Sequence, residues 1–277
     1  MDGVELKRTL SSGGMVFGCM ISAMGTTRFR SALAGSTLDF VVIDSEHGSR
    51  DRKEISELCR MLRDVDIVPI VRVPVPKAEW VAMALDAGAA GVLVPYCETV
   101  EEVEACVGTA KWHPLKGEYL RRAVREGVLP SEQSKTYLEG RRAESIIIIG
   151  IESEPAVRNL EALLDVGSID GVFIGPNDMT TSLGAPDEVT HPRYLEVIRD
   201  VVATSESRGV PVMIHHQTLE SSTAAIELGA RFVMHSSDAR LMQAAMQEQM
   251  AALRAAGAQR GAATSRGGAG GDTIETV

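Results

Sequence analysis

Two acidic residues, Glu152 and Asp178, each follow a short apolar run, and one amphipathic helix separates the two runs. The first run, Ile146 to Ile149, has no polar alternation, which is typical of a parallel strand covered by helices on both faces. The second run is Gly171 to Ile174. Because Mg²⁺ and Mn²⁺ prefer oxygen ligands, two acids at neighbouring strand ends can share one such cation. Either acid alone could instead be a helix-capping residue.

Further polar residues follow two earlier apolar runs. The run Phe40 to Ile43 is followed by Asp44, Glu46 and His47, and a third run ends at Arg72. A histidine close to an aspartate can act as a base, and an arginine can stabilise the negative charge of an enolate. With a divalent metal, these residues predict enolate chemistry on an oxo acid.

Each of these residues also has a purely structural interpretation. The Asp44–His47 segment could be a hydrogen-bonded turn, and Arg72 could pair with Asp64 or Asp66. The adjacent His215 and His216 could be surface residues. Cys97 has no identified base partner, which argues against a nucleophilic role, and the sequence contains no phosphate-binding glycine loop or dinucleotide fingerprint.

The elements that position these residues alternate regularly along the chain. Three segments repeat a helix–glycine–strand pattern: DAGAAGVLVP, DVGSIDGVFIGP and ELGARFVMHSS. Such repetition favours a single (β/α)₈ TIM barrel over a doubly wound sheet, and it places all strand ends at one mouth. Eight strands are expected, at Met15–Ile21, Phe40–Ile43, Ile67–Val71, Gly91–Val94, Ile146–Ile149, Gly171–Ile174, Val210–Ile214 and Phe232–His235.

Outside the repeats we expect three further features. The weakly periodic segment Trp112 to Gly140 is longer than an ordinary connection and should lie over one mouth of the barrel. A long Met- and Ala-rich helix, Ala239 to Ala256, should end the domain, which spans residues 1–256. Residues 257–277, rich in Gly, Ala, Ser and Arg, should form a disordered tail.

Composition narrows the class of partner and compartment. The chain has 277 residues and a net charge of −10, which argues against binding to nucleic acid or anionic membranes. Its four cysteines show no zinc-like or C-x-x-C spacing, so we expect reduced thiols and a cytoplasmic location. Asp2, Glu5 and the interruption at Gly18 argue against a signal peptide, and no run approaches a membrane span.

Taken together, five segments resemble the HpcH/HpaI family of metal-dependent (class II) 2-oxo acid aldolases. They are FVVIDSEHG, VPIVRVP, ALDAGAAGVLVP, IGIESEPAVRNLEALLDV and GVFIGPNDMTTSLG, which span Asp39 to Gly184, with a weaker return in GARFVMHSSD. The resemblance implies a TIM barrel, a bound Mg²⁺ or Mn²⁺, and a pyruvate-type substrate. It also implies a homo-oligomer, a hexamer or dimer, in which the C-terminal helix is exchanged between subunits.

The resemblance also implies individual roles. Glu152 and Asp178 would hold the metal, Arg72 would stabilise the enolate, and Asp44 with His47 would form the proton-transfer pair. The acid matching Asp86 would support the site near a subunit contact. The remaining expected substrate contacts are Pro176, Asn177 and His235.

Two departures from the family pattern concern the second substrate. Tyr119 stands where an arginine is usual, with Arg121 or Arg122 as possible replacements, and histidines at 215, 216 and 235 stand where small or apolar residues are usual. Our principal hypothesis is a metal-dependent lyase that forms or cleaves a C–C bond next to a pyruvate-type enolate. One alternative is an oxaloacetate-using enzyme, either a decarboxylase or a citrate synthase-like enzyme that uses acetyl-CoA. The other is a non-catalytic barrel scaffold.

Overall fold

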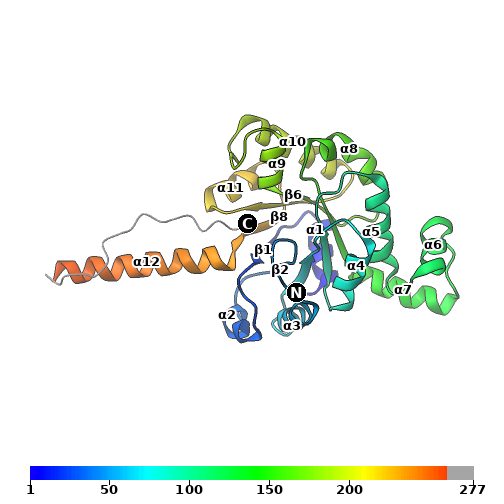
Figure 1. The fold of residues 1–277 in the computed structure, drawn as a ribbon, viewed down its shortest axis with the longest axis horizontal. Coiled ribbons are helices and arrows are strands. Elements are labelled where there is room, and N and C mark those ends of the chain that lie inside the picture. Colours follow the sequence, from blue (N-terminus) through cyan, green and yellow to red (C-terminus); the bar gives the residue numbers. More distant parts are fainter. Residues whose placement is uncertain (261–277) are drawn as a thin grey trace.

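The computed structural model describes residues 1–260 and shows a closed barrel of eight parallel strands in sequential order, β1 to β8. Each strand pairs in register with its chain neighbours, and β1 pairs with β8 to close the barrel. This confirms the expected TIM barrel (Figure 1). The strands are β1 Val16–Ile21, β2 Phe40–Asp44, β3 Val68–Arg72, β4 Gly91–Val94, β5 Ile146–Gly150, β6 Gly171–Ile174, β7 Val212–His216 and β8 Phe232–Ser237.

Helices connect the strands, and most begin at a side chain that caps free backbone N–H groups. Thr99 and Glu102 form a full capping box at the start of α5, as the sequence pattern predicts. The helices are α1 Gly3–Ser11, η1 Thr27–Phe29, α2 Arg30–Leu33, α3 Arg52–Arg63, α4 Ala78–Asp86, α5 Val100–Trp112, α6 Gly117–Glu126, α7 Glu132–Glu144, α8 Glu154–Asp165, α9 Pro176–Ser182, α10 Pro192–Ser207, α11 Leu219–Glu227 and α12 Asp238–Gln259.

The strands bury side chains on both faces, which explains their continuous apolar sequences. One cluster fills the barrel interior and includes Phe40, Phe173 and Phe232. A larger cluster, which includes Val41 and Ile149, lies between the strands and the surrounding helices. Successive strand residues therefore point alternately into the barrel and toward the helices. This alternation decides which polar residues at the strand ends can reach a common cavity.

The N-terminal helix α1 was not anticipated. Its buried residues Leu6 and Leu10 join the interior cluster, so α1 closes the barrel at the end where the strands begin. The segment expected over one mouth instead forms α6 and α7, which pack on α5 and project outward from the barrel (Figure 1). That expectation was wrong because α6 packs on α5 at the side of the barrel, where Ala123 is buried and Val124 lies against Gly108.

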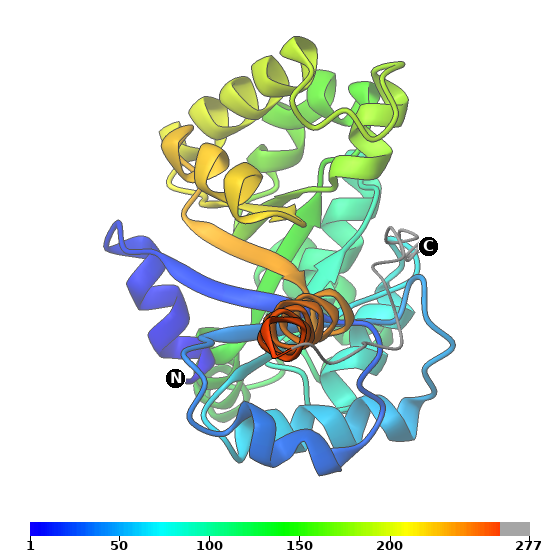
Figure 2. The ribbon, with the colours of Figure 1, turned by 90° about the vertical axis from the view of Figure 1, so that its left-hand side faces the viewer.

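Helix α12 leaves the barrel after β8 and projects away from it (Figures 1 and 2). Only its first residue, Asp238, is buried. The helix runs through Gly257 to Gln259, beyond the expected end at Ala256, so the first residues of the expected tail are helical. Residues 261–277 of that tail lie outside the described residues.

Candidate active site

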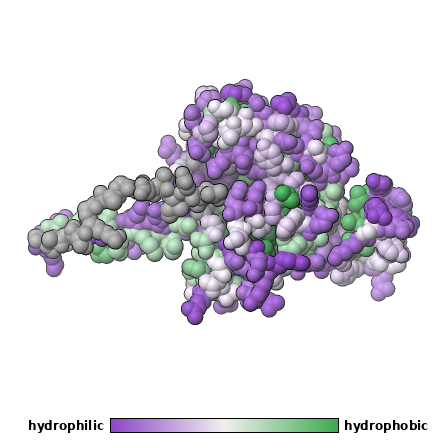
Figure 3. Space-filling model, viewed as in Figure 1, coloured by the Kyte–Doolittle hydropathy of each residue, from purple (hydrophilic) through white to green (hydrophobic). Residues whose placement is uncertain are grey.

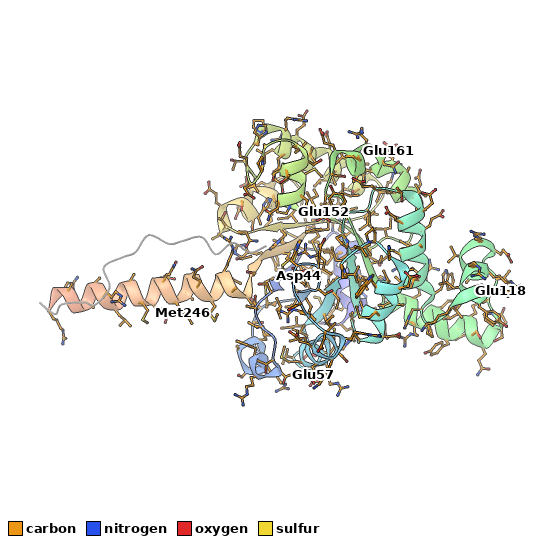
Figure 4. All side chains as sticks on the ribbon, viewed as in Figure 1. Asp44, Glu57, Glu118, Glu152, Glu161 and Met246 are labelled. Atoms are coloured by element: carbon orange, nitrogen blue, oxygen red, sulfur yellow. The ribbon has the colours of Figure 1, made fainter. Side chains whose placement is uncertain are left out.

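A cavity of about 490 Å³ lies where the strands end, and seven strands or the loops after them contribute to its wall. Asp44, Arg72 and Glu152 come from β2, from β3 and from the loop after β5. In Figure 4, Asp44 and Glu152 lie near the middle of the barrel, far from Met246 on α12 and Glu118 on α6. The other lining residues are Met20, Ser22, Ala23, His47, Gly48, Phe173, Gly175, Pro176, Asn177, Asp178, His215, Gln217, Ser237 and Ala239.

Glu152 is held in a narrow space that two glycines make possible. A Cβ added at Gly175 would lie 2.0 Å from Oε1 of Glu152, and one at Gly150 would lie 2.7 Å from Oε2. The backbone N–H of Tyr96 donates to Oε2 at 2.6 Å. Burial raises the pKa of Glu152 to about 8, although the positive charge of Arg72 acts in the opposite direction. The carboxylate is therefore fixed in position and lacks the solvation that an anion requires.

Asp178 lies in the first turn of α9 and is exposed at the cavity wall. Its charge adds to the rise in the pKa of Glu152, which shows that the two carboxylates repel each other across the cavity. A hard divalent cation between them would remove this repulsion, and the all-oxygen donor set suits Mg²⁺ or Mn²⁺. The described residues contain no cluster of three or more His, Cys, Asp or Glu side chains that could hold a metal. Two protein ligands would leave positions open for water and substrate.

Arg72 is anchored by two acids from the loop after β2. Its Nε and Nη2 donate to the two carboxylate oxygens of Asp44 at 3.0 and 2.7 Å, and its Nη1 lies 3.1 Å from Glu46. Burial alone would raise the pKa of Asp44, but the bonds and charge of Arg72 keep that pKa below its ordinary value. The simpler interpretation, in which Arg72 pairs with Asp64 or Asp66, is therefore wrong. The guanidinium is held rigidly at the cavity wall.

His47 also lines the cavity, but its ring does not form the expected pair with Asp44. The backbone N–H of His47 donates to Asp44 at 3.4 Å, while the ring Nε2 lies 3.7 Å from Glu46. The reason is that Arg72 occupies both oxygens of Asp44. The His47 side chain is 36% exposed, so its ring can reach a molecule in the cavity.

Of the remaining predicted residues, Pro176 and Asn177 line the cavity, whereas His235 and Asp86 do not. His235 follows the interior residue Met234 on β8, so it points outward, where its Nδ1 lies 2.9 Å from Ser222 Oγ. Asp86 ends α4, which leads back to the start of β4, and it pairs with His113 at 3.2 Å.

Tyr119 lies on α6, is 56% exposed and does not line the cavity. It therefore cannot contact a molecule bound there within one chain. His215 and Gln217, at the end of β7, do line it. The sequence identifies His215 only as one of two adjacent histidines at a strand end. It does not show which of the two faces the barrel interior and so lines the cavity.

Comparisons with known proteins agree with this geometry. The family model for HpcH/HpaI aldolase/citrate lyase matches residues 23–245. The chain is 31% identical over 235 residues to the hydroxypyruvate/pyruvate aldolase of Roseobacter denitrificans, covering 84% of this chain and 90% of the relative. It is 28% identical over 258 residues to the 2-keto-3-deoxy-L-rhamnonate aldolase of Klebsiella pneumoniae, covering 91% of this chain and 94% of the relative.

Solved structures show the same fold. A HpcH/HpaI aldolase/citrate lyase family protein from Burkholderia cenocepacia superposes with a TM-score of 0.78 at 26% identity, covering 90% of this chain and 99% of that one. A HpcH/HpaI aldolase from Desulfitobacterium hafniense gives a TM-score of 0.77 at 25% identity, covering 90% and 96%. The family match spans most of the chain and includes every acid that lines the cavity. The chain therefore belongs to the HpcH/HpaI aldolase/citrate lyase family.

Proposed function

We propose that this protein is a divalent metal-dependent aldolase that forms or cleaves a C–C bond next to the enolate of a pyruvate-type 2-oxo acid. The observation that carries the proposal is the buried Glu152 carboxylate, which the two glycines fix opposite Asp178. Within the described residues, no Lys, Arg or His forms an ion pair with Glu152. The aldolase relatives support the same class of reaction.

Each lining residue has a role that follows from its position. Glu152 and Asp178 would hold Mg²⁺ or Mn²⁺, which supplies a positive charge that polarises the keto group of the substrate. Arg72 places a second fixed positive charge where the enolate oxygen becomes negative. His47 is the exposed imidazole at the wall and can accept or return a proton. Pro176 and Asn177 line the wall beside Asp178, where they would contact the carboxylate of the oxo acid.

The test is proton exchange of the pyruvate methyl group in D₂O, followed by proton NMR with Mg²⁺, with Mn²⁺ and with EDTA. We expect metal-dependent exchange that falls at least about 100-fold in Glu152→Gln and in Arg72→Ala. Glu57→Gln, a change to an exposed residue of α3, is the matched control and should exchange at the wild-type rate. Exchange that persists in EDTA, or in Glu152→Gln, would refute the site.

A complete lack of exchange would instead point to another donor substrate. Assays with oxaloacetate, with and without acetyl-CoA, then distinguish decarboxylation from condensation. If all of these activities are absent in a folded protein, the scaffold interpretation is the remaining one. The anchored Arg72 and the fixed Glu152 argue against that interpretation, because a scaffold has no need to keep a buried carboxylate that a second carboxylate repels.

We also propose that α12 associates with a second copy of this chain. One face carries exposed apolar side chains at helical spacing, namely Met242, Met246, Met250 and Leu253, and Figure 3 shows pale green along this helix. In the described residues, no helix is long and apolar enough to cross a membrane. Met246→Glu should reduce the molar mass measured by light scattering after gel filtration, whereas Gln247→Glu should not. An unchanged mass in Met246→Glu would refute this role.

The four cysteines are buried and free, which is consistent with the reducing cytoplasm that the composition predicts.

A further inference from the structure

The cavity wall has two chemically different halves. The strands and loops from β2 to β6 supply every charged lining residue: Asp44, Arg72, Glu152 and Asp178, with the titratable His47. The ends of β7, β8 and β1 supply only uncharged residues, of which the polar ones are His215, Gln217, Ser237 and Ser22. The proposed enolate chemistry needs the charged half. The uncharged half is left to face the second reactant.

His215 is the most distinctive group in the uncharged half. It is the penultimate residue of β7, and it is buried with 8% of its surface exposed, at the cavity. Its Nε2 lies 3.2 Å from the carbonyl oxygen of Ser236 and 3.3 Å from the side-chain amide of Gln217. Because a carbonyl oxygen only accepts hydrogen bonds, Nε2 carries the proton, and the neutral ring leaves a lone pair on Nδ1. Within the described residues, Nδ1 has no hydrogen-bond partner and is not sealed off from solvent.

The ring stays neutral at physiological pH. Burial, followed by the positive charge of Arg72, lowers the pKa of His215 to about 4. A neutral imidazole with its Nε2–H already engaged offers the cavity only one function, which is to accept a hydrogen bond at Nδ1. The natural donor to such a group is a hydroxyl of a bound molecule.

We propose that the second reactant of the proposed aldolase is a neutral hydroxyaldehyde, whose hydroxyl group donates a hydrogen bond to Nδ1 of His215. This rests on the proposed function. In the condensation direction, the methyl carbon of pyruvate loses a proton and bonds to the aldehyde carbon, and the aldehyde oxygen takes up one proton. No oxidant, reductant or further reactant is required.

The charge distribution argues against an anionic acceptor. Among the described residues, Arg72 is the only Lys or Arg that lines the wall, and Asp44 and Glu46 already bind it. A phosphate or second carboxylate on the acceptor would therefore be desolvated against the uncharged half without a positively charged side chain as partner. A neutral hydroxyl group carries no such penalty, and Gln217, Ser22 and Ser237 can hydrogen-bond to further hydroxyls.

The experiment compares acceptors that differ in one feature, with pyruvate as donor and Mg²⁺ present. Glycolaldehyde and propionaldehyde differ by a hydroxyl in place of a methyl, and we expect kcat/KM to favour glycolaldehyde about 10-fold. Glyceraldehyde and glyceraldehyde 3-phosphate differ in charge, and we expect kcat/KM to favour the neutral aldehyde at least about 10-fold. A preference for the phosphorylated aldehyde would overturn the proposal.

Three variants assign the preference to His215. His215→Leu should reduce the glycolaldehyde-to-propionaldehyde ratio to within about 2-fold of unity, since leucine fills the space without an acceptor. His215→Asn, whose amide can donate to Ser236 and still accept at its oxygen, should retain a ratio at least about 3-fold above that of the leucine variant. His235→Leu is the matched control, because His235 points away from the cavity, and it should keep the wild-type ratio.

The outcomes separate this inference from the proposed function. Absence of pyruvate methyl exchange in the wild type would refute the proposed function itself. Wild-type exchange, together with an acceptor ratio that is unchanged in His215→Leu, would refute the role of His215 alone. An equal loss on both acceptors would show that His215 only maintains the structure of the site, which also contradicts the proposal.

Discussion

Gly175→Ala is expected to disable the metal site without changing any ligand. The new Cβ would lie 2.0 Å from Oε1 of Glu152, whereas real Cβ contacts essentially never fall below 3.0 Å. The carboxylate must therefore move by at least 1 Å. It cannot do so freely, because Gly150 and the N–H of Tyr96 confine its other oxygen. The backbone of Gly175 has φ −78° and ψ 112°, which alanine adopts without strain, so the effect arises from the contact alone.

The size of the effect follows from that displacement. A misplacement of about 1 Å in a catalytic group costs on the order of 100-fold in rate, and the crowding itself should cost about 1–3 kcal/mol of stability. We expect the metal-dependent exchange of pyruvate to fall by about 100-fold, with a higher half-saturating Mg²⁺ concentration. Proton NMR during a Mg²⁺ titration measures both quantities, and thermal unfolding measures the stability change.

Gly140→Ala is the matched control for this experiment. A Cβ at Gly140, within α7, meets no atom within 4 Å, so the substitution should preserve exchange and slightly stabilise the helix. Wild-type exchange and Mg²⁺ dependence in a folded Gly175→Ala protein would refute the argument that the fixed position of Glu152 matters to the chemistry.

Two further predictions concern His215 and Asp238. Because the pKa of His215 is about 4 in the fold and 6.5 in the unfolded chain, the unfolded chain binds more protons between these values, and stability falls as the pH drops through this window. His215 alone contributes a loss of about 2 kcal/mol from pH 7 to pH 5, and the raised pKa of Glu152 contributes in the opposite direction. The test is therefore the difference between wild type and His215→Asn in the pH dependence of urea unfolding, which should be about 2 kcal/mol; the same pH dependence in both proteins would contradict the pKa. Asp238 accepts hydrogen bonds from the backbone N–H groups of Ser22, Ala23 and Met24. Asp238→Asn should therefore lower the free energy of unfolding by about 2–3 kcal/mol and raise the KM for the aldehyde. An unchanged KM would show that this loop does not position the acceptor.

The sequence was sufficient to predict the barrel, because each strand is buried on both faces and must be apolar along its length. It also predicted that Asp44, Arg72, Glu152 and Asp178 meet at one mouth, since parallel strands all end at the same face. Both predictions depend only on the direction of the strands. Neither requires knowledge of the exact residue at which a side chain turns inward.

The predictions that failed depend on finer geometry. His235 and His215 each lie near a strand end, but an offset of one residue sends one outward and the other into the cavity. The sequence places an aspartate and a histidine three residues apart, yet Arg72 takes both oxygens of that aspartate. Competition among several partners for one side chain is settled by three-dimensional packing and not by spacing along the chain.

The division of the cavity wall has a consequence for how this scaffold diversifies. The groups proposed to form the enolate and those proposed to select the acceptor lie on different strands, so a change at the ends of β7, β8 or β1 need not disturb the metal ligands. Gene duplication followed by a few substitutions on those three strands would yield enzymes with the same donor and new products. Directed evolution of this protein toward other aldehydes should begin with saturation of positions 22, 215, 217 and 237.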